Sequence, residues 1–177
     1  MSAQPFLFAE TPWMEVRDAN PTALAIFRRH YSYKPYRDGR KPLHFVGPGE
    51  KMVLLTPDVR ALFVWRKFIS GDGQQGVNCA VFRNESNRVA SELILEAETC
   101  ALRRWPGERF YTYVNPRKVR RSRTPGRCFL KAGWRYVSDG NGKRVLTKHR
   151  RLLILEKLPK TTALPEFLTT KGQDGPH

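Results

Sequence analysis

Acidic residues are scarce in this sequence. Its 177 residues contain 16 aspartates and glutamates against 32 lysines and arginines, which gives a formal net charge of +16. Such a charge disfavours cationic partners and favours phosphate backbones or acidic membrane surfaces. The chain also lacks an apolar run of the roughly 20 residues that cross a bilayer, and its first residues lack the pattern of a secretion signal. We therefore expect a soluble, cytoplasmic protein that does not enter a membrane.

Cysteine is also rare. Cys79, Cys100 and Cys128 are odd in number, widely spaced and set among apolar residues. This pattern disfavours a disulfide framework and a zinc site, so we predict reduced thiols and no metal. Cys128 has no base near it in the sequence, which favours a small buried side chain over a nucleophile.

The positive charge is concentrated in one segment. Residues 103–151 hold sixteen lysines and arginines and two acidic residues, so 14 of the 16 excess positive charges lie there. The densest run is a predicted loop between Asn115-Pro116 and Thr124-Pro125-Gly126. The alternative to a binding role is a solvated loop that only maintains solubility. We predict nucleic-acid contacts for Arg117, Lys118, Arg120, Arg121, Arg123 and Arg127.

A second basic stretch, residues 33–42, mixes tyrosines with cations. Tyrosine rings can stack on bases while lysines and arginines meet phosphates. The tyrosines could instead pack against their own domain. We predict that nucleic acid is bound here by Lys34, Tyr36, Arg37, Arg40 and Lys41.

Hydrophobic periodicity and turn residues predict a mixed α/β chain. Asn20-Pro21 is typical of a helix start, and residues 90–105 have apolar side chains at helical spacing, with acids early and arginines late. Short β-branched and aromatic runs predict strands, with a hairpin turn at Thr56-Pro57-Asp58. The expected strands are 14–17, 51–56, 61–69, 77–82, 110–114, 134–137 and 150–158, and the expected helices are 21–30, 90–105 and 127–132, with Gly133 as the C-cap.

The length of the chain favours one domain. We expect it to span residues 1–158, because residues 159–177 are rich in Pro, Thr, Gly and Lys and indicate a flexible tail. Trp65, Trp105 and Trp134 are expected in the core rather than on a surface that stacks bases.

The order of these elements resembles the GNAT N-acetyltransferase fold over about residues 14–157. More narrowly, His30-Tyr31-Ser32 after the first helix, with Arg83-Asn84, Arg88 and Ser91 before the long helix, resembles the Mom family of phage DNA-modification proteins. The resemblance implies an α/β (α+β) single domain. Its mixed, mostly antiparallel central sheet is expected to be flanked by helices and splayed at the central strands.

The same resemblance implies a function. Mom-like proteins place a carbamoylmethyl-type group on adenine N6 and thereby protect phage DNA from restriction. The implied partner is double-stranded DNA rather than RNA, in the host cytoplasm. The acceptor base must leave the duplex, because a paired exocyclic amine is not free to react. Two alternatives remain open: acetylation of a protein or small amine, and nucleic-acid binding without catalysis.

The turn before the long helix is the expected cofactor site. Helix N-termini bind anions, and in the GNAT fold this turn holds the pyrophosphate of CoA, so the resemblance implies acetyl-CoA or a related acyl donor. The turn here lacks the glycines usual in that fold, and its arginines could instead pair with Glu85 or Glu92. The candidate ligands are Arg83, Asn84, Ser86, Asn87, Arg88 and Ser91.

Candidate catalytic groups lie after the first helix and within this turn. His30 could act as a base, Tyr31 and Ser32 could orient the substrate, and Glu85 could accept a proton or bind an amine. The alternative for residues 30–32 is structural, since imidazoles and hydroxyls often satisfy the free carbonyls at a helix end.

The strands supply the remaining candidates. Asn78, an amide within an apolar strand, could face the substrate or make a structural hydrogen bond. Tyr113 and Asn115 are expected on the other side of the splay, facing the substrate. Phe129 stands where many GNAT enzymes have the tyrosine that protonates the leaving thiolate. Phenylalanine has no such proton, so ordinary acetyl transfer would need another acid.

Overall fold

The computed structural model describes residues 12–41, 43–119 and 124–160. Within these ranges the chain forms a seven-stranded mixed sheet with three α-helices and one short 3₁₀ helix. Three predicted nucleic-acid contacts, Arg120, Arg121 and Arg123, lie outside the described residues. The same holds for the predicted tail from residue 161 onward.

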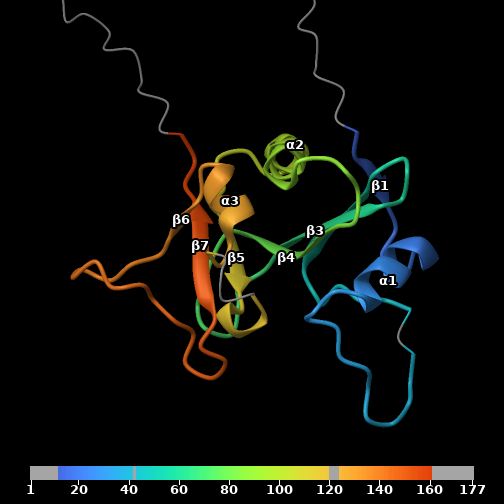
Figure 1. Cartoon of the computed structure of the whole chain (residues 1–177), viewed down its shortest axis with the longest axis horizontal. Coiled ribbons are helices and arrows are strands. Elements are labelled where there is room, and N and C mark those ends of the chain that lie inside the picture. The colour runs from blue at the N-terminus through green and yellow to red at the C-terminus, as the bar shows by residue number, and fades with distance from the viewer. Residues whose placement is uncertain (1–11, 42, 120–123, 161–177) are drawn as a thin grey trace, which may run out of the picture.

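The sheet is mostly antiparallel, in the order β1-β2-β3-β4-β5-β7-β6 (Figure 1). β4 and β5 pair in parallel, and the other neighbouring strands pair antiparallel. The predicted strands are confirmed, with ends that differ by a few residues. They are β1 (Met14–Val16), β2 (Glu50–Leu55), β3 (Ala61–Lys67), β4 (Val77–Asn84), β5 (Phe110–Val114), β6 (Arg135–Tyr136) and β7 (Leu153–Lys157).

The three predicted helices are also present, as α1 (Pro21–Arg28), α2 (Ala90–Arg104) and α3 (Arg127–Lys131). The Asn20 side chain caps α1 by accepting hydrogen bonds from two backbone N–H groups, each at 3.0 Å. Gly133, with a φ of +86°, follows α3 where the chain needs a left-handed residue. Among the described helices, none has the length and apolarity required to cross a bilayer.

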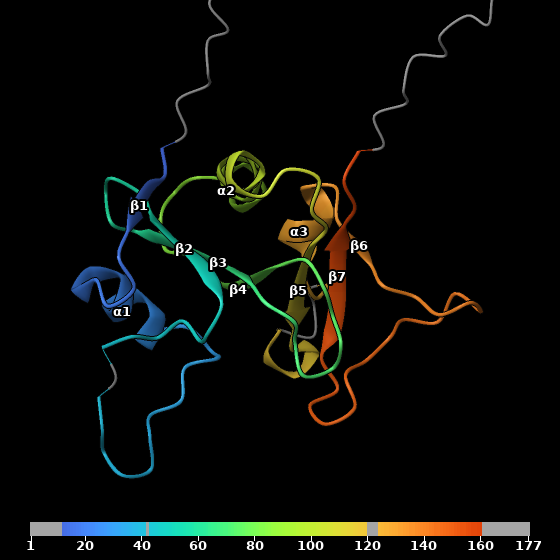
Figure 2. The same cartoon turned by 180° about the vertical axis from the view of Figure 1, so that it is seen from behind.

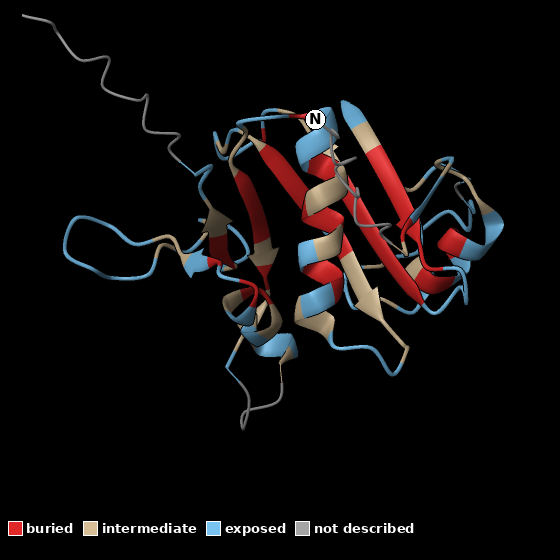
Figure 3. Ribbon diagram, turned by 90° about the horizontal axis from the view of Figure 1, so that it is seen from above, coloured by how far each residue is buried: buried red, intermediate tan, exposed pale blue. Residues whose placement is uncertain are grey.

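Helices cover both faces of the sheet, α1 on one side and α2 and α3 on the other (Figures 1 and 2). The larger hydrophobic core lies under α2 and α3 and contains Trp65, Trp105 and Trp134, as predicted. A smaller core joins α1 to β2, β3 and β4. Seen from the α2 side, the strands beneath this helix are largely buried, whereas the segment between β6 and β7 is exposed (Figure 3).

Polar side chains attach α2 to the sheet at fixed points. The indole of Trp65 donates to the Ala97 carbonyl at 3.0 Å. Glu98, buried in the middle of α2, accepts from the Trp134 indole at 2.6 Å and from the Lys157 ammonium. Because buried polar groups are stable only when paired, these contacts fix α2 and the turn before it relative to the strands.

The central strands β4 and β5 separate after a short paired stretch. Three residues of each strand pair, ending with Cys79 opposite Thr112. Against β3, Cys79 and Val81 pair with consecutive residues, so Ala80 is an extra residue that forms a β-bulge. Ala80 is exposed although it lies on a central strand. The two strands therefore enclose a gap that opens toward their carboxyl ends.

Candidate functional site

The segment that follows α1 lies along the separated ends of β4 and β5. His30 lies against β4, where its imidazole is hydrogen-bonded to the Phe82 backbone and lies near the charge of Arg83. The Tyr31 hydroxyl meets the backbone of Asn115 at the end of β5. The two rings lie 4.4 Å apart between centroids, inclined by 32°. Three predicted site residues, His30, Tyr31 and Asn115, are thus brought together.

His30 is neutral at physiological pH. Burial, and then the positive charge of Arg83, lowers the pKa of His30 to about 4, against the opposing effect of the Phe82 backbone. Its Nδ1 accepts from the Ser32 N–H at 3.2 Å and lies 2.7 Å from Ser32 Oγ. A ring with its proton on Nε2 satisfies all these contacts. The exposed polar group beside the imidazole is therefore the Ser32 hydroxyl.

Tyr31 retains its proton, because burial of its hydroxyl raises the pKa, partly offset by the Asn115 backbone. The same hydroxyl lies near Cys79 and Cys128. Burial raises the pKa of both thiols, so neither is an activated nucleophile. The protonated group available at this side of the gap is therefore the Tyr31 hydroxyl.

Glu85 is held by two arginines. Arg29 donates to both carboxylate oxygens, at 2.8 and 2.7 Å, and Arg83 donates to Oε1. Hydrogen bonds from Arg29 and then Arg83 lower the pKa of Glu85 to about 2. A carboxylate this acidic is a poor proton acceptor near pH 7. The geometry thus favours a structural role for Glu85 over the predicted catalytic one.

The turn before α2 is hydrogen-bonded to its own side chains. Asn84 Oδ1 accepts from the N–H and the hydroxyl of Ser86, at 2.9 and 2.6 Å. Ser86 Oγ accepts from the Arg88 N–H at 3.2 Å. The ion pairing raised as an alternative from the sequence occurs: Arg83 pairs with Glu85 as expected there, and the Arg88 guanidinium pairs at 2.6 Å with Glu96 rather than with Glu92. The N–H groups of Ser86 and Arg88, which could bind a phosphate, are satisfied internally.

These contacts do not fit the pyrophosphate of CoA. Val89 begins α2 without a side-chain cap, which leaves the first helical N–H groups oriented toward solvent or a ligand. Both arginines expected to bind the anion are nevertheless paired with glutamates. Asn87 and Ser91 form no side-chain hydrogen bond with any residue that the structure describes. The expectation of an acyl-CoA donor therefore gains no support from the arrangement of this turn.

Asn78 and Asn115 both make structural hydrogen bonds. Asn78, 4% exposed, donates to the Tyr111 carbonyl at 3.3 Å, where β4 and β5 still pair. Asn115 accepts from the Arg117 N–H at 3.0 Å and caps the 3₁₀ helix Pro116–Lys118 in the segment predicted as a loop. Asn78 thus lies at the closed end of the gap, and Asn115 lies at its open end.

Tyr113 was predicted to face the substrate between the central strands, but its side chain lies in a separate groove. Its hydroxyl donates to Asp72 Oδ1 at 2.7 Å, in a groove on the sheet face opposite α2 and α3. Asp72 stands between two glycines and was given no role from the sequence, so the groove was missed. The signal that could have found it is a lone carboxylate between glycines in an otherwise basic chain.

Two exposed basic arms flank the gap. The first arm is residues 33–41, and the second arm is residues 138–152 between β6 and β7; they project from opposite sides of the sheet in Figures 1 and 2. In the first arm, Arg40 pairs with Asp38 at 2.5 Å and lies 5.2 Å from the centre of the Tyr36 ring. Other exposed cations include Lys34, Arg37, Lys41, Arg117, Lys118 and Arg127, which were predicted, and Lys143, Arg144, Lys148, Arg150 and Arg151, which were not assigned as contacts.

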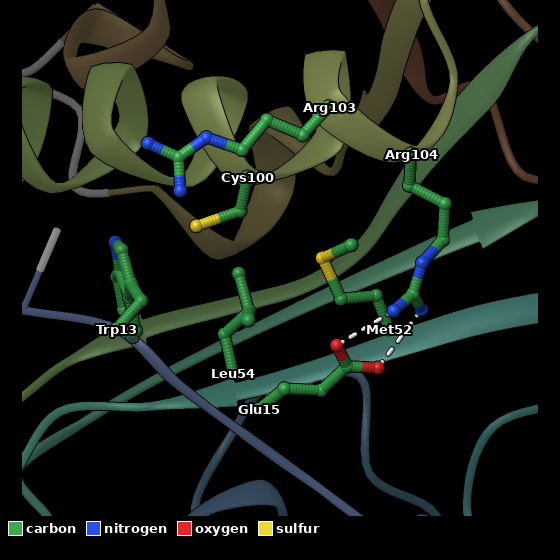
Figure 4. Close-up of a pocket in the computed structure, with 7 residues that line it drawn as sticks. All are labelled: Trp13, Glu15, Met52, Leu54, Cys100, Arg103 and Arg104. Carbon is green, nitrogen blue, oxygen red and sulfur yellow. Dashed lines mark hydrogen bonds and ion pairs between the residues drawn. The ribbon is translucent and has the colours of Figure 1, made fainter. Parts of the chain in front are cut away.

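A separate cavity of about 390 Å³ lies between the β1–β2 edge and the second half of α2 (Figure 4). An ion pair between Arg104 and Glu15, at 2.7 Å, closes one side of it. None of the predicted site residues is among its lining residues, which are Trp13, Glu15, Met52, Leu54, Cys100, Arg103 and Arg104.

No cluster of three or more His, Cys, Asp or Glu side chains suited to a metal ion occurs among the residues described. The chain matches no protein-family model, no curated protein and no solved structure at a significant level. Function must therefore be argued from the site itself.

Proposed function

We propose that this protein is a DNA-modifying transferase that adds a group to the exocyclic amine of a base, with adenine N6 as the acceptor. The observation that carries the proposal is the position of His30-Tyr31-Ser32 along the separated ends of β4 and β5, with an exposed basic arm on each flank. The strand order and the gap support a GNAT-like arrangement of the Mom type. The biological role would be protection of phage DNA from restriction.

The gap holds groups suited to an amine acceptor. The Ser32 hydroxyl can take a proton from the attacking amine while its own proton moves to His30 Nδ1, 2.7 Å away. The low pKa of His30 keeps this nitrogen unprotonated near pH 7, although it also makes the imidazole a weak base. Tyr31 keeps its proton and can donate to the leaving group, a role that Phe129 cannot fill.

The β-bulge adds backbone groups to the site. Beyond Cys79, β4 has no strand paired to its β5-facing edge within the described residues. Ala80 is exposed at that point, so a ligand can reach this part of the strand. A backbone N–H aimed into a gap can stabilise negative charge that develops on a carbonyl oxygen of the transferred group.

The arms supply the polyanion contact that the reaction needs. The acceptor amine must leave the base stack, and the energy for this comes from contacts with the surrounding backbone. Exposed cations on both flanks can hold phosphates on either side of an extruded base while the gap stays open between them. The charge distribution thus favours a nucleic acid over a small or cationic amine as the acceptor.

The proposal is tested by expressing the protein in a bacterial host, digesting the genomic DNA to nucleosides and analysing them by mass spectrometry. Wild type should produce a heavier deoxyadenosine, and His30→Ala should produce about 100-fold less of it or none. His44→Ala is the matched control, because the His44 side chain is 74% exposed and outside the gap. Unmodified nucleosides from a folded, DNA-binding wild type would refute the proposal, as would full activity of His30→Ala.

A second candidate is a nucleic-acid-binding protein without catalysis. It is favoured by the paired state of Arg83, Glu85 and Arg88 and by the hydrogen bonds on both nitrogens of His30. In that case variants of the arms abolish function in the cell and His30→Ala leaves it intact. Acetylation of a protein or small amine would instead appear as transfer from acetyl-CoA to a free amine, with no change in DNA.

A further inference from the structure

A groove of about 900 Å³ lies on the sheet face opposite α2 and α3, over β5 and β7. Its walls are the connection from β3 to β4, which passes close to β5 and β7 in Figure 2, and the last part of the second arm. The floor is aromatic and aliphatic, with Phe68, Tyr113, Leu152 and Ile154. This size and lining are typical of clefts that bind a small molecule or a nucleotide.

A carboxylate with unused hydrogen-bonding capacity lies in the groove. Asp72 Oδ1 accepts from the Tyr113 hydroxyl at 2.7 Å and from the Ser70 hydroxyl. No residue in the described part of the chain donates to the other oxygen, Oδ2. The loop that carries Asp72 is itself held, because Arg109 donates to the Gln74 side chain at 3.0 Å and Ser70 accepts from the Gln74 N–H at 2.8 Å. The acceptor oxygen is therefore held in position for a donor from a ligand.

Directly beneath the groove lies a buried hydroxyl that is also unsatisfied. Tyr111 is fully buried, and its hydroxyl, near Ser70 and Asp72, has no hydrogen-bond partner among the described residues. An unpaired buried polar group costs stability, so its presence here needs a physical reason. The reason would be a polar ligand that binds beside Asp72 and rearranges the groups around the Tyr111 hydroxyl.

The rim of the groove carries the opposite charge. Lys148, His149 and Arg150 of the second arm line one side and are exposed. A single carboxylate inside and cations at the rim match a molecule with an amino group at one end and a phosphate at the other. An amine-only ligand, such as a lysine side chain, would be repelled by the rim.

We propose that this groove binds one unpaired base that carries an exocyclic amino group, with its backbone phosphate on the second arm. The base stacks on Tyr113 and the apolar floor, and its amino group donates to Asp72 Oδ2. The inference rests on the proposed function, since it names the site that receives the acceptor base from the duplex.

The groove and the gap both adjoin β5. Tyr113 lines the groove, and Asn115 follows directly after the end of the same strand. The Asn115 backbone meets the Tyr31 hydroxyl at the mouth of the gap. A base that leaves the duplex at the second arm would thus contact the groove before its amine reaches His30-Tyr31-Ser32.

The test is equilibrium binding of the full-length protein to labelled duplexes, without any donor molecule. One duplex is fully paired, one has an adenine opposite an abasic site, and one has a thymine there. Wild type should bind the unpaired adenine about tenfold more tightly than either other duplex. Asp72→Asn and Tyr113→Phe should each remove most of this preference while keeping full affinity for the paired duplex.

The control variant is Glu15→Gln, which removes the same negative charge at the distant β1 edge and should keep the preference. Simple electrostatics predicts that Asp72→Asn tightens binding to every duplex, so a selective loss for unpaired adenine identifies the groove. Preference retained by both groove variants, equal binding of adenine and thymine, or no preference in wild type would overturn the inference. The binding experiment measures no group transfer. Its outcome is therefore independent of whether the nucleoside experiment detects a modified base.

Discussion

Two regions of this molecule are basic in sequence but differ in the state of their charges. In the turn before α2, Arg83 pairs with Glu85 and Arg88 pairs with Glu96. In the second arm, Lys148 is exposed and has no carboxylate partner among the described residues. A paired arginine must lose its partner to bind a phosphate, whereas an exposed cation releases only counterions. The comparison teaches that the folded position of the few acidic residues decides which cations are available to an anionic ligand.

The paired charges of the turn should affect the stability of the fold more than the binding of a ligand. The largest expected effect on stability is the pH dependence due to His30, which lies beside Arg83. Its folded pKa of about 4 lies below the ordinary 6.5, so the folded state binds fewer protons between these values. The resulting stability, about 3 kcal/mol, is present above pH 6.5 and is lost as the pH falls toward 4. Urea denaturation at pH 7 and pH 4.5 should show this loss in wild type and a smaller one in His30→Gln.

The contribution of Arg83 to the pKa of His30 can be measured separately. Because its positive charge is the second cause of the low pKa of His30, Arg83→Gln should raise that pKa in an NMR titration of the imidazole. Arg150→Gln, which removes an equal charge from the second arm, should leave it unchanged. A shift of equal size in both variants would show that the two regions do not differ as described.

The affinity for DNA should depend on the cations of the second arm and not on the arginines of the turn. Replacing Lys148 and Arg150 by glutamine should lower the slope of log affinity against log salt concentration by roughly 2, since about 0.9 counterions are released per phosphate contact. Replacing Arg83 and Arg88 by glutamine removes the same formal charge and should leave the slope unchanged. Fluorescence anisotropy titrations at several salt concentrations measure both. Equal slopes for the two double variants would remove the distinction between the regions.

The smallest expected effect concerns the ion pairs of the turn. Glu85→Gln should lower the free energy of unfolding by about 1 kcal/mol, because the carboxylate accepts from two arginines but remains partly exposed to solvent. Asp38→Asn, which breaks a more exposed pair with Arg40 in the first arm, should change it by only a few tenths. Chemical denaturation at pH 7 compares them. A larger effect for Asp38→Asn would contradict a structural role for the turn.

Local features of the fold were predictable from the sequence. The cap at Asn20, the hairpin turn at Thr56-Pro57-Asp58 and the glycine after α3 depend on residues close to one another in the chain, and all three are confirmed. Strand ends were less accurate, as in β7, which begins at Leu153 rather than near residue 150. Pairing with a neighbouring strand, which the sequence of one strand does not contain, decides where a strand begins.

The candidate site was predictable only as a set of residues. His30, Tyr31 and Asn115, predicted separately as site residues, lie together at the gap, whereas Glu85 was expected to be available and is held by Arg29, 56 residues away. The groove was not anticipated, because the bond between Tyr113 and Asp72 joins residues 41 positions apart. Neither pairing leaves a periodic or local pattern in the sequence.

The sequence by itself determined the order of helices and strands, the burial of the tryptophans and the excess of positive charge, because these follow from local propensity, periodicity and composition. Tertiary structure alone decided the rest. The bulge at Ala80 lies where the central strands separate, Arg29 is brought to Glu85 from 56 residues away, and a loop places Asp72 over β5. Each of these depends on distances between segments far apart in the chain, and electrostatic and hydrogen-bond energies act only across such short final distances.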